Sequence, residues 1–362
     1  MNWPTSRVDE LKAPDRHSCV GGPFGSELTR RDYVEEGVPV IRGVNLPHDQ
    51  QFYDDEFVFV SDQKADQLYA NSARPGDLVF TQRGTLGQVG LIPQEAKFPR
   101  YIISQSQMKL TVDPTKIIAK YAFYYFRQKR MVDLIARRAI TSGVPHINLG
   151  ILKSLDVAVP PPDVQAAIVE HLDVYSRAIE NNRRRMELLE QSARLLFREW
   201  FVHLRYPAHE HDKIVDGTPE GWQRTTLASV TTKIGSGATP RGGESAYKTD
   251  GIALIRSQNV YDYRFEEAGL AFIDDEQADQ LANVEVQAGD VLLNITGASV
   301  GRCCLVPSWC VPARVNQHVM IIRARKQDVN PYYLLCTLNS DSQKRYLLSV
   351  SSGGVSREAL TK

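Results

Sequence analysis

Residues 75–93 read PGDLVFTQRGTLGQVGLIP, and residues 288–307 read AGDVLLNITGASVGRCCLVP. A Gly-Asp pair, two later glycines and the final proline recur in both stretches, with one residue inserted in the second. An internal repeat bears on the whole fold, so it is sought first. Each stretch alternates short apolar runs with glycines, which is typical of strands joined by turns. The pair therefore predicts that the chain holds one domain twice.

The repeat extends well beyond these two stretches. YVEEGVPVIRGVNL (33–46) matches YKTDGIALIRSQNV (247–260), and SQSQM (104–108) matches NQHVM (316–320). Further on, SGVPHINL (142–149) matches GGVSREAL (353–360). The matches are collinear, and their separation drifts only between 211 and 214 residues. This period is too long for a solenoid, whose repeats have about 20 to 45 residues, so two homologous globular copies are expected.

Each copy predicts a mixture of short strands and helix. VPVIRGV, DLVFTQ, VGLIP and MKLTV are rich in β-branched and apolar residues, which favours strands. Residues 120–139 and 331–349 each predict one helix, so the fold class is α+β. Gln82-Arg83 in the first copy stands opposite Ile295-Thr296 in the second. Such differences within a shared frame are expected of two modules that bind different ligands; ordinary divergence of exposed loops is the alternative.

A different pattern separates the copies. Pro160, Pro161 and Pro162 end the first copy, and the next proline is Pro207. Between them, large or apolar residues recur in alternating steps of four and three, the a/d pattern of a coiled coil. A helix over 163–201 would be roughly 58 Å long and needs a partner helix to cover its stripe. The predicted seam and partner-contacting residues are Ile168, Leu172, Tyr175, Ile179, Asn182, Met186, Leu189, Leu196 and Trp200.

These patterns divide the chain into three parts. A first domain is predicted at 1–159, a long spacer helix within 160–206, and a second domain at 207–362.

Composition excludes some classes of protein without selecting one. The 43 basic and 43 acidic residues cancel, which argues against a polycation that coats nucleic acid but allows a local basic face. No apolar run reaches the roughly 18 residues of a membrane span, and the first residues lack the pattern of a secretory signal. The five cysteines show no zinc-ligand spacing and are expected to be free thiols in a reducing cytoplasm, with no metal bound.

Motifs of catalysis are also missing from the sequence. No HExxH, GxSxG, P-loop or dinucleotide-binding fingerprint is present, which favours a non-catalytic chain. Two alternatives stay open: a single-chain methyltransferase or nuclease whose site these motifs do not reveal, and a coiled-coil scaffold whose globular copies bind protein. Binding of S-adenosylmethionine by the isolated chain would favour the enzyme.

Two divergent globular copies joined by a long helix resemble the specificity subunit of type I restriction–modification systems. The resemblance covers nearly the whole chain. It is carried by IRGVNL, IRSQNV, the paired Gly-Asp turns and above all SGVPHINLGILKSLDVAVPPPDVQAAIVEHL (142–172). It implies two target recognition domains that each read one half of a bipartite double-stranded DNA sequence, while helices set the gap. It also implies methyltransferase (modification) subunits that carry S-adenosylmethionine, a restriction subunit for cleavage, and no cofactor in this chain.

Candidate base-reading residues follow from residue chemistry, because Arg favours guanine while Asn and Gln favour adenine. In the first copy the predicted DNA contacts are Arg42, Asn45, Gln82, Arg83, Thr85, Gln105 and Gln107. In the second copy they are Arg256, Gln258, Asn259, Asn294, Thr296, Gln317 and His318.

One departure from the resembled family concerns the second copy. In that family two long helices pair in antiparallel fashion, whereas here the second copy reaches Lys362 at the position equivalent to residue 151. The second helix is therefore expected to be missing. Either the chain is truncated, or a second chain supplies the helix.

Overall fold

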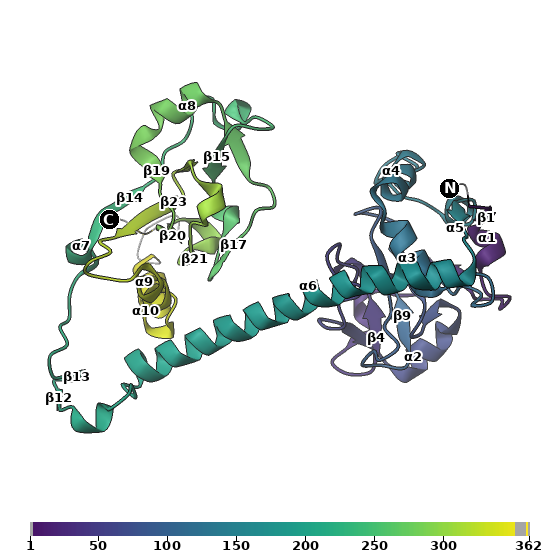
Figure 1. Cartoon of the computed structure of the whole chain (residues 1–362), viewed down its shortest axis with the longest axis horizontal. Coiled ribbons are helices and arrows are strands. Elements are labelled where there is room, and N and C mark those ends of the chain that lie inside the picture. The colour runs from purple at the N-terminus through teal and green to yellow at the C-terminus, as the bar shows by residue number, and fades with distance from the viewer. Residues whose placement is uncertain (1–2, 352–359, 361–362) are drawn as a thin grey trace. The chain divides into compact units, whose positions relative to one another are not determined.

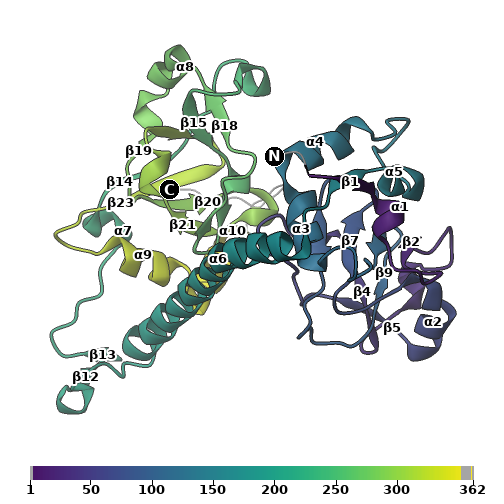
Figure 2. The same cartoon turned by 45° about the vertical axis from the view of Figure 1, so that its right-hand side comes forward.

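The computed structural model describes residues 3–351 and residue 360. The chain divides into two compact units, Met1–Met186 and Glu187–Lys362 (Figures 1 and 2). Helices and strands are mixed in both units, which agrees with the predicted α+β class. The boundary between these units falls between Met186 and Glu187, inside the long helix. The predicted three-part division at 159/160 and 206/207 therefore stays a prediction.

The first unit contains two main sheets. One is antiparallel with the order β2-β10-β7-β8. The other has the order β3-β5-β4-β9-β6, in which β4 and β9 are parallel. A short pair, β1 (Thr5–Arg7) with β11 (Asp156–Ala158), joins the two ends of this unit's globular part. The other strands are β2 (Cys19–Gly21), β3 (Tyr33–Val34), β4 (Val38–Ile41), β5 (Val58–Val60), β6 (Ser72–Ala73), β7 (Leu78–Thr81), β8 (Val89–Leu91), β9 (Tyr101–Ile103) and β10 (Gln107–Leu110).

The second unit repeats this topology except at β3, whose counterpart is a single bridge between Lys248 and Phe272. Its sheets have the orders β14-β23-β20-β21 and β18-β15-β22-β19, and the central pair β15 and β22 is again parallel. This shared order confirms the predicted duplication, although GGVSREAL lies outside the described residues except for Leu360. The strands are β12 (Ile214–Val215), β13 (Thr218–Pro219), β14 (Thr231–Ser236), β15 (Ile252–Ile255), β16 (Val260–Tyr261), β17 (Arg264–Phe265), β18 (Ala271–Ile273), β19 (Glu285–Val286), β20 (Val291–Asn294), β21 (Cys303–Leu305), β22 (Ala313–Val315) and β23 (Val319–Ala324).

The repeated Gly-Asp pair makes the same turn in both units. Gly76 has a φ of 90° and Gly289 a φ of 86°, in the left-handed region that favours glycine. The carboxylate of Asp77 accepts a hydrogen bond from the backbone N–H three residues earlier at 2.8 Å, and that of Asp290 does the same at 2.8 Å. Each turn leads directly into a fully buried strand, β7 or β20, so the pair fixes where the central strand of each sheet begins.

The two buried aspartates differ in their partners. Asp290 receives two hydrogen bonds of 2.8 Å from the guanidinium of Arg323, and this bidentate pairing raises the pKa of Arg323. Asp77 instead accepts a hydrogen bond from the Thr111 hydroxyl at 2.5 Å, and the Lys109 ammonium lies 3.8 Å away. The second unit therefore holds its turn with the stronger ion pair.

Two helices stand where the sequence predicted one. In the first unit α3 (Ala119–Arg127) and α4 (Lys129–Arg137) are separated by Gln128, whose ψ of 137° breaks the helical path. In the second unit α9 (Pro331–Leu338) is followed by α10 (Asp341–Ser351). The expected single helices over 120–139 and 331–349 were therefore wrong. The remaining short helices are α1 (Val8–Leu11), α2 (Asp62–Gln67), α5 (Leu149–Lys153), α7 (Leu227–Val230) and α8 (Asp275–Gln280).

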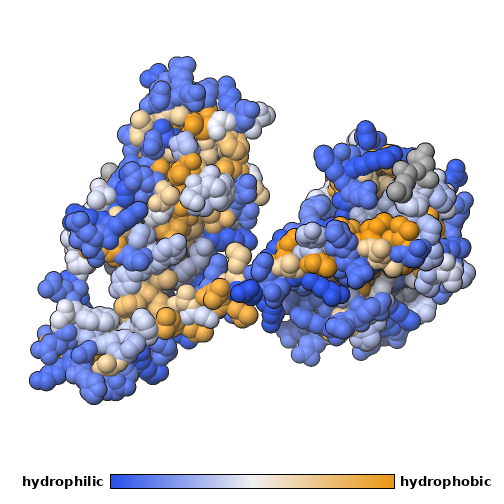
Figure 3. Space-filling view, viewed as in Figure 1, coloured by the Kyte–Doolittle hydropathy of each residue, from blue (hydrophilic) through white to orange (hydrophobic). Residues whose placement is uncertain are grey.

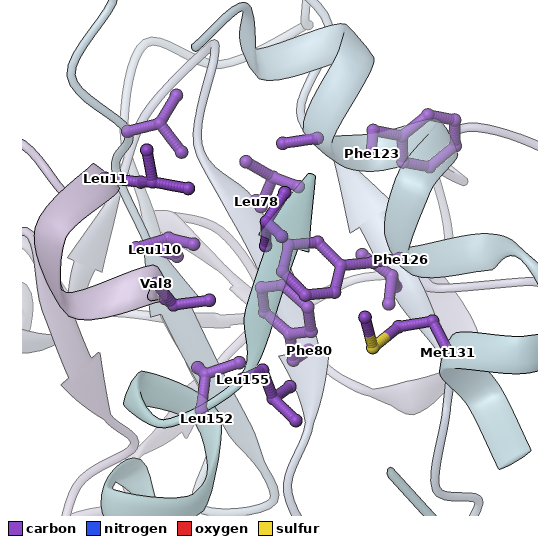
Figure 4. Close-up of a cluster of buried hydrophobic side chains, with 14 of the residues drawn as sticks. Val8, Leu11, Leu78, Phe80, Leu110, Phe123, Phe126, Met131, Leu152 and Leu155 are labelled. Atoms are coloured by element: carbon purple, nitrogen blue, oxygen red, sulfur yellow. The ribbon is translucent and has the colours of Figure 1, made fainter. Parts of the chain in front are cut away.

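The largest core of the first unit lies between the four-stranded sheet and helices α3 and α4. Phe80 from β7 meets Phe126 from α3 edge-to-face, with ring centroids 5.0 Å apart (Figure 4). Leu78, Leu110 and Leu152 belong to the same cluster and are almost fully buried. Burial of this apolar surface, at about 25 cal/mol per Å², is the main force that holds the helices on the sheet.

The predicted long helix is α6 (Pro162–Phe197), continued by one π-helical segment, Arg198–Val202. Its 36 residues span about 54 Å. Much of the a/d seam is open to solvent: Tyr175 is 59% exposed, Met186 62% and Leu189 68%. Ile168, which packs against the core of the first unit, and Trp200 are half-buried. Apolar residues along this helix show as orange patches in Figure 3.

Polar side chains attach the start of α6 to the first unit. Gln165 is buried, accepts a hydrogen bond from the Ile118 N–H at 2.8 Å and donates one to the Pro160 carbonyl at 2.9 Å. Asp173 accepts a hydrogen bond from the Tyr124 hydroxyl at 2.6 Å and pairs with the Lys120 ammonium at 2.8 Å. The first turns of α6 are therefore fixed against the rest of the first unit.

Candidate nucleic-acid interface

One end of the four-stranded sheet in the first unit gathers several of the predicted DNA contacts. Strands β7 and β10 are antiparallel with Thr81 opposite Gln107, so the residues after β7 and those before β10 meet at the same end. A shallow surface hollow lies there, and four of the predicted residues line it: Arg42, Arg83, Thr85 and Gln107. Arg83 and Thr85 are exposed. We call this end of the sheet the polar end.

Gln105 lies at the polar end but its side chain already has partners. Its Nε2 donates hydrogen bonds to the carbonyls of Gly25 and Leu28, the latter at 3.0 Å. Gln82 is half-buried, and its backbone N–H donates to the Ser106 carbonyl at 2.7 Å. Both residues therefore stand at the surface, while Gln105 also holds the loop at 22–28 in place.

Asn45 and Asn259 have a structural role that the sequence pattern did not reveal. Both side chains are fully buried. The Oδ1 of Asn45 accepts from the Arg42 N–H at 2.9 Å, and its Nδ2 donates to the carbonyls of Tyr53 and Asp55 at 3.0 and 2.9 Å. Asn259 makes the equivalent three bonds, at 3.0 Å to the Arg256 N–H and at 2.9 and 3.5 Å to two carbonyls of the next loop. With every polar atom used on backbone, neither side chain is offered to a base.

The two arginines beside these asparagines are also tied to the scaffold. Arg42 donates from Nη2 to the Glu56 carbonyl at 2.8 Å, and Arg256 donates from Nη2 to the Gly269 carbonyl at 2.7 Å. Gln258 donates to the same Gly269 carbonyl at 3.0 Å. Arg42 and Arg256 are half-buried and Gln258 is exposed, so a contact with DNA stays a prediction for all three.

In the second unit the equivalent end of the sheet carries a connected polar group. The Thr296 hydroxyl lies 2.6 Å from Nδ1 of His318, whose Nε2 lies 2.9 Å from Nε2 of Gln317. Asn294 is fully buried beneath them and donates to the Ser257 carbonyl at 2.9 Å. Thr296, Gln317 and His318 therefore form the counterpart of the polar end, while Asn294 supports the backbone.

Four of the residues predicted to contact DNA are thus buried in the structure. Asn45, Gln107, Asn259 and Asn294 are at most 1% exposed and hold backbone or neighbouring side chains. For the exposed and half-buried residues, contact with DNA stays a prediction. Contact of the α6 seam with a partner also stays a prediction; Asn182 is exposed and Trp200 is half-buried against Phe201.

The described part of the chain was searched for clusters of metal-binding side chains and for reactive thiols. No group of three or more His, Cys, Asp or Glu side chains there is placed to hold a metal ion. Burial raises the pKa of the Cys303 and Cys304 thiols to about 12 and that of Cys310 to about 11, so these thiols stay protonated at neutral pH. Within residues 3–351, no helix is long and apolar enough to cross a membrane.

Phe24, on the loop that Gln105 holds, is a surface residue that the sequence patterns missed. Its side chain is 88% exposed, the highest value among the large apolar residues of the described chain. A single apolar residue in the glycine-rich stretch GGPFGSE (21–27) gives no periodic signal, although its neighbours rule out a buried strand at that point.

Comparisons with known proteins were consistent with the fold. The family model described as "Type I restriction modification DNA specificity domain" matches residues 33–191. The MjaIX type I restriction enzyme specificity subunit of Methanocaldococcus jannaschii is 24% identical over 189 residues, covering 51% of this chain and 42% of that protein. A putative MjaX specificity subunit of the same organism is 23% identical over 282 residues, covering 74% and 64%. The matches therefore span less than two thirds of these curated relatives.

A solved structure supports the architecture. The S subunit of a type I restriction-modification system from M. genitalium superposes with a TM-score of 0.50 at 15% sequence identity, covering 97% of this chain and 81% of that one. Its likeness shows the fold alone. Residues 33–191 therefore match a type I restriction–modification DNA specificity domain, and the second unit repeats the strand order of that domain.

Proposed function

We propose that this chain is a sequence-specific subunit for double-stranded DNA, without catalysis of its own. Each unit reads one half of a bipartite target, and α6 sets the gap between the halves. Methylation is done by modification subunits, which hold S-adenosylmethionine, and cleavage by a restriction subunit. Because its target is the DNA of the cell, we place it in the cytoplasm.

The observation that carries this proposal is the difference between two otherwise equivalent sheet ends. Both units share strand order, the Gly-Asp turn and the buried asparagine network. At the polar end, however, the first unit presents Arg83 and Thr85, and the second presents Thr296 and His318. Base edges in the major groove are distinguished by donors and acceptors, so different side chains on one frame suit two different half-sites.

The long helix supports the same proposal. A continuous helix of about 54 Å exceeds one turn of DNA, which is about 34 Å. Its exposed apolar residues, including Ile179, Met186 and Leu189, are suited to partner helices or to modification subunits. Whether the partner helix comes from a second copy of this chain or from another subunit is decided by the stoichiometry of the assembled complex.

The test is DNA protection by the full chain assembled with its modification subunits. We expect one bipartite sequence to be protected, and scrambling either half to abolish protection. Arg83→Ala should relax discrimination only in the first half, and His318→Ala only in the second. Arg16→Ala removes another exposed arginine, near the opposite end of the first sheet, and should leave recognition of both halves unchanged. Binding without any sequence preference would overturn the proposal, and S-adenosylmethionine binding by the isolated chain would favour an enzyme.

A further inference from the structure

The most exposed large apolar side chain of the described residues stands on a well-held loop. Phe24 is 88% exposed and lies between β2 and the short turn at Arg30–Asp32. Single exposed apolar residues are common on protein surfaces, so exposure by itself assigns no role. Hydrogen bonds hold the backbone of this loop beside the segment that carries Gln105 and Gln107.

Hydrogen bonds close the loop around Phe24. Its N–H donates to the Glu27 carboxylate at 3.0 Å, and the Glu27 N–H donates back to the Phe24 carbonyl at 3.1 Å. From the other side, the Gln105 amide donates to the carbonyls of Gly25 and Leu28. Leu28 itself is only 5% exposed and belongs to a buried cluster with Val38 and Val40. The loop is therefore closed on itself and fixed at its far end.

The loop also lies directly against the polar end. A Cβ on Gly22 would come within 2.0 Å of the Ser104 carbonyl, so the backbone approaches that segment as closely as glycine allows. The Gly22 N–H donates to the Gln107 carbonyl at 2.8 Å. Phe24 is thus two residues from a point of contact with the segment that carries Gln105 and Gln107. The same segment, through Ser106 and Gln107, lines the hollow that holds Arg83 and Thr85.

The second unit offers an internal comparison. In KIGSGATP (233–240), Gly237 makes the equivalent close approach, because its Cβ would lie 2.2 Å from the carbonyls of Val315 and Asn316. Two residues later stands Thr239, where the first unit has Phe24. The backbone device is shared, whereas the aromatic side chain is present in the first unit only. Its presence is therefore not a requirement of the fold.

We propose that Phe24 inserts as an apolar wedge into one base step of the first half-site, and that the second unit reads its half without such a wedge. This proposal rests on the proposed DNA-binding function. Apolar side chains that enter between base pairs unstack them in part, and the cost depends on the step, so a wedge adds sequence preference at a position without hydrogen bonds. Because the Phe24 side chain is exposed in the free chain, its apolar surface would be buried only when DNA binds.

The experiment uses the full chain with its modification subunits and DNA that carries 2-aminopurine at successive steps of each half-site. We expect fluorescence to rise on binding at one step of the first half and at none of the second. Phe24→Ala should abolish that rise and weaken binding about tenfold, a size typical of one lost stacking contact. Phe24→Trp should retain both the fluorescence rise and the wild-type affinity. Because Phe24 is exposed, neither variant is expected to change folding, which the unfolding midpoint checks.

The matched control is Tyr69→Ala, which removes an aromatic residue that is 55% exposed and lies beside His17, away from the polar end. It should leave both the fluorescence rise and the affinity unchanged. Wild-type protein that protects its bipartite sequence but gives no fluorescence rise in the first half, or a Phe24→Ala variant that keeps the rise, overturns the wedge and leaves the DNA-binding proposal standing. Wild-type protein without sequence preference overturns the DNA-binding proposal instead.

Discussion

Replacing Asn45 with alanine separates a structural role from a reading role. The substitution removes three hydrogen bonds, of 2.9, 3.0 and 2.9 Å, and leaves one N–H and two carbonyls of the backbone without that partner. A net loss of about 1 kcal/mol for each bond gives a destabilisation of about 3 kcal/mol for the first unit. For a unit of this size that corresponds to a fall in Tm of about 6–12 °C. Asn259→Ala should cost the second unit slightly less, since one of its bonds is 3.5 Å long.

Urea denaturation followed by circular dichroism measures both losses. Three of the four tryptophans, Trp200, Trp222 and Trp309, belong to the second unit, so tryptophan fluorescence reports mainly on Asn259→Ala. Gln63→Ala removes an exposed amide from α2 and should change stability by less than about 0.5 kcal/mol. If Asn45→Ala left stability unchanged and abolished recognition of the first half-site, the structural role would be refuted and the residue would be a base reader.

Three further predictions concern other parts of the chain. Arg323→Ala leaves Asp290 buried without its bidentate partner and should destabilise the second unit by about 3–5 kcal/mol. Lys109→Ala should destabilise the first unit far less, because its ammonium lies 3.8 Å from Asp77. Urea midpoints that fall by the same amount in both variants would contradict this difference. Burial alone raises the pKa of Asp173, but hydrogen bonds from Lys120 and Tyr124 outweigh it and hold the pKa below its usual value. The stabilisation is therefore present at neutral pH and lost as the pH falls below about 3.9, so Asp173→Asn should speed hydrogen exchange at the start of α6 at pH 7 and make little difference in acid. Deleting seven residues within 170–190 should shorten the recognised gap without changing either half-site, and methylated-base mapping that shows an unchanged gap would exclude a ruler role for α6.

Much of the fold could be predicted from the sequence because each element expected in one copy could be compared with its counterpart in the other. The strands at VPVIRGV and DLVFTQ were supported by matching runs in the other copy, and both appear as buried strands. The long helix followed from a heptad pattern that continues past the one polar seam residue, Asn182. The break at Gln128 was missed because neither proline nor glycine marks it; the helix ends there so that α3 and α4 can pack separately on the sheet.

The sequence located the candidate site better than it predicted which of the site's side chains are buried. Asn and Arg have the chemistry for base recognition, so Asn45 and Arg83 looked alike in the sequence. One signal could have separated them: Asn45 recurs as Asn259, whereas Arg83 is replaced by Thr296. Residues shared by both copies are expected to belong to the common frame, and the buried network around both asparagines has that role.

The same asparagine network bears on how such a protein can change over generations. Asn45 holds the following loop only through main-chain atoms, and Asn259 does so across a loop that is one residue shorter. Loop residues other than those with their own partners, such as the buried Phe52 and the Asp54 that accepts from the Tyr101 hydroxyl, can therefore vary in identity and number while the asparagine keeps its bonds. Natural variants of the chain should therefore differ more in these two loops, in sequence and in length, than at the two asparagines.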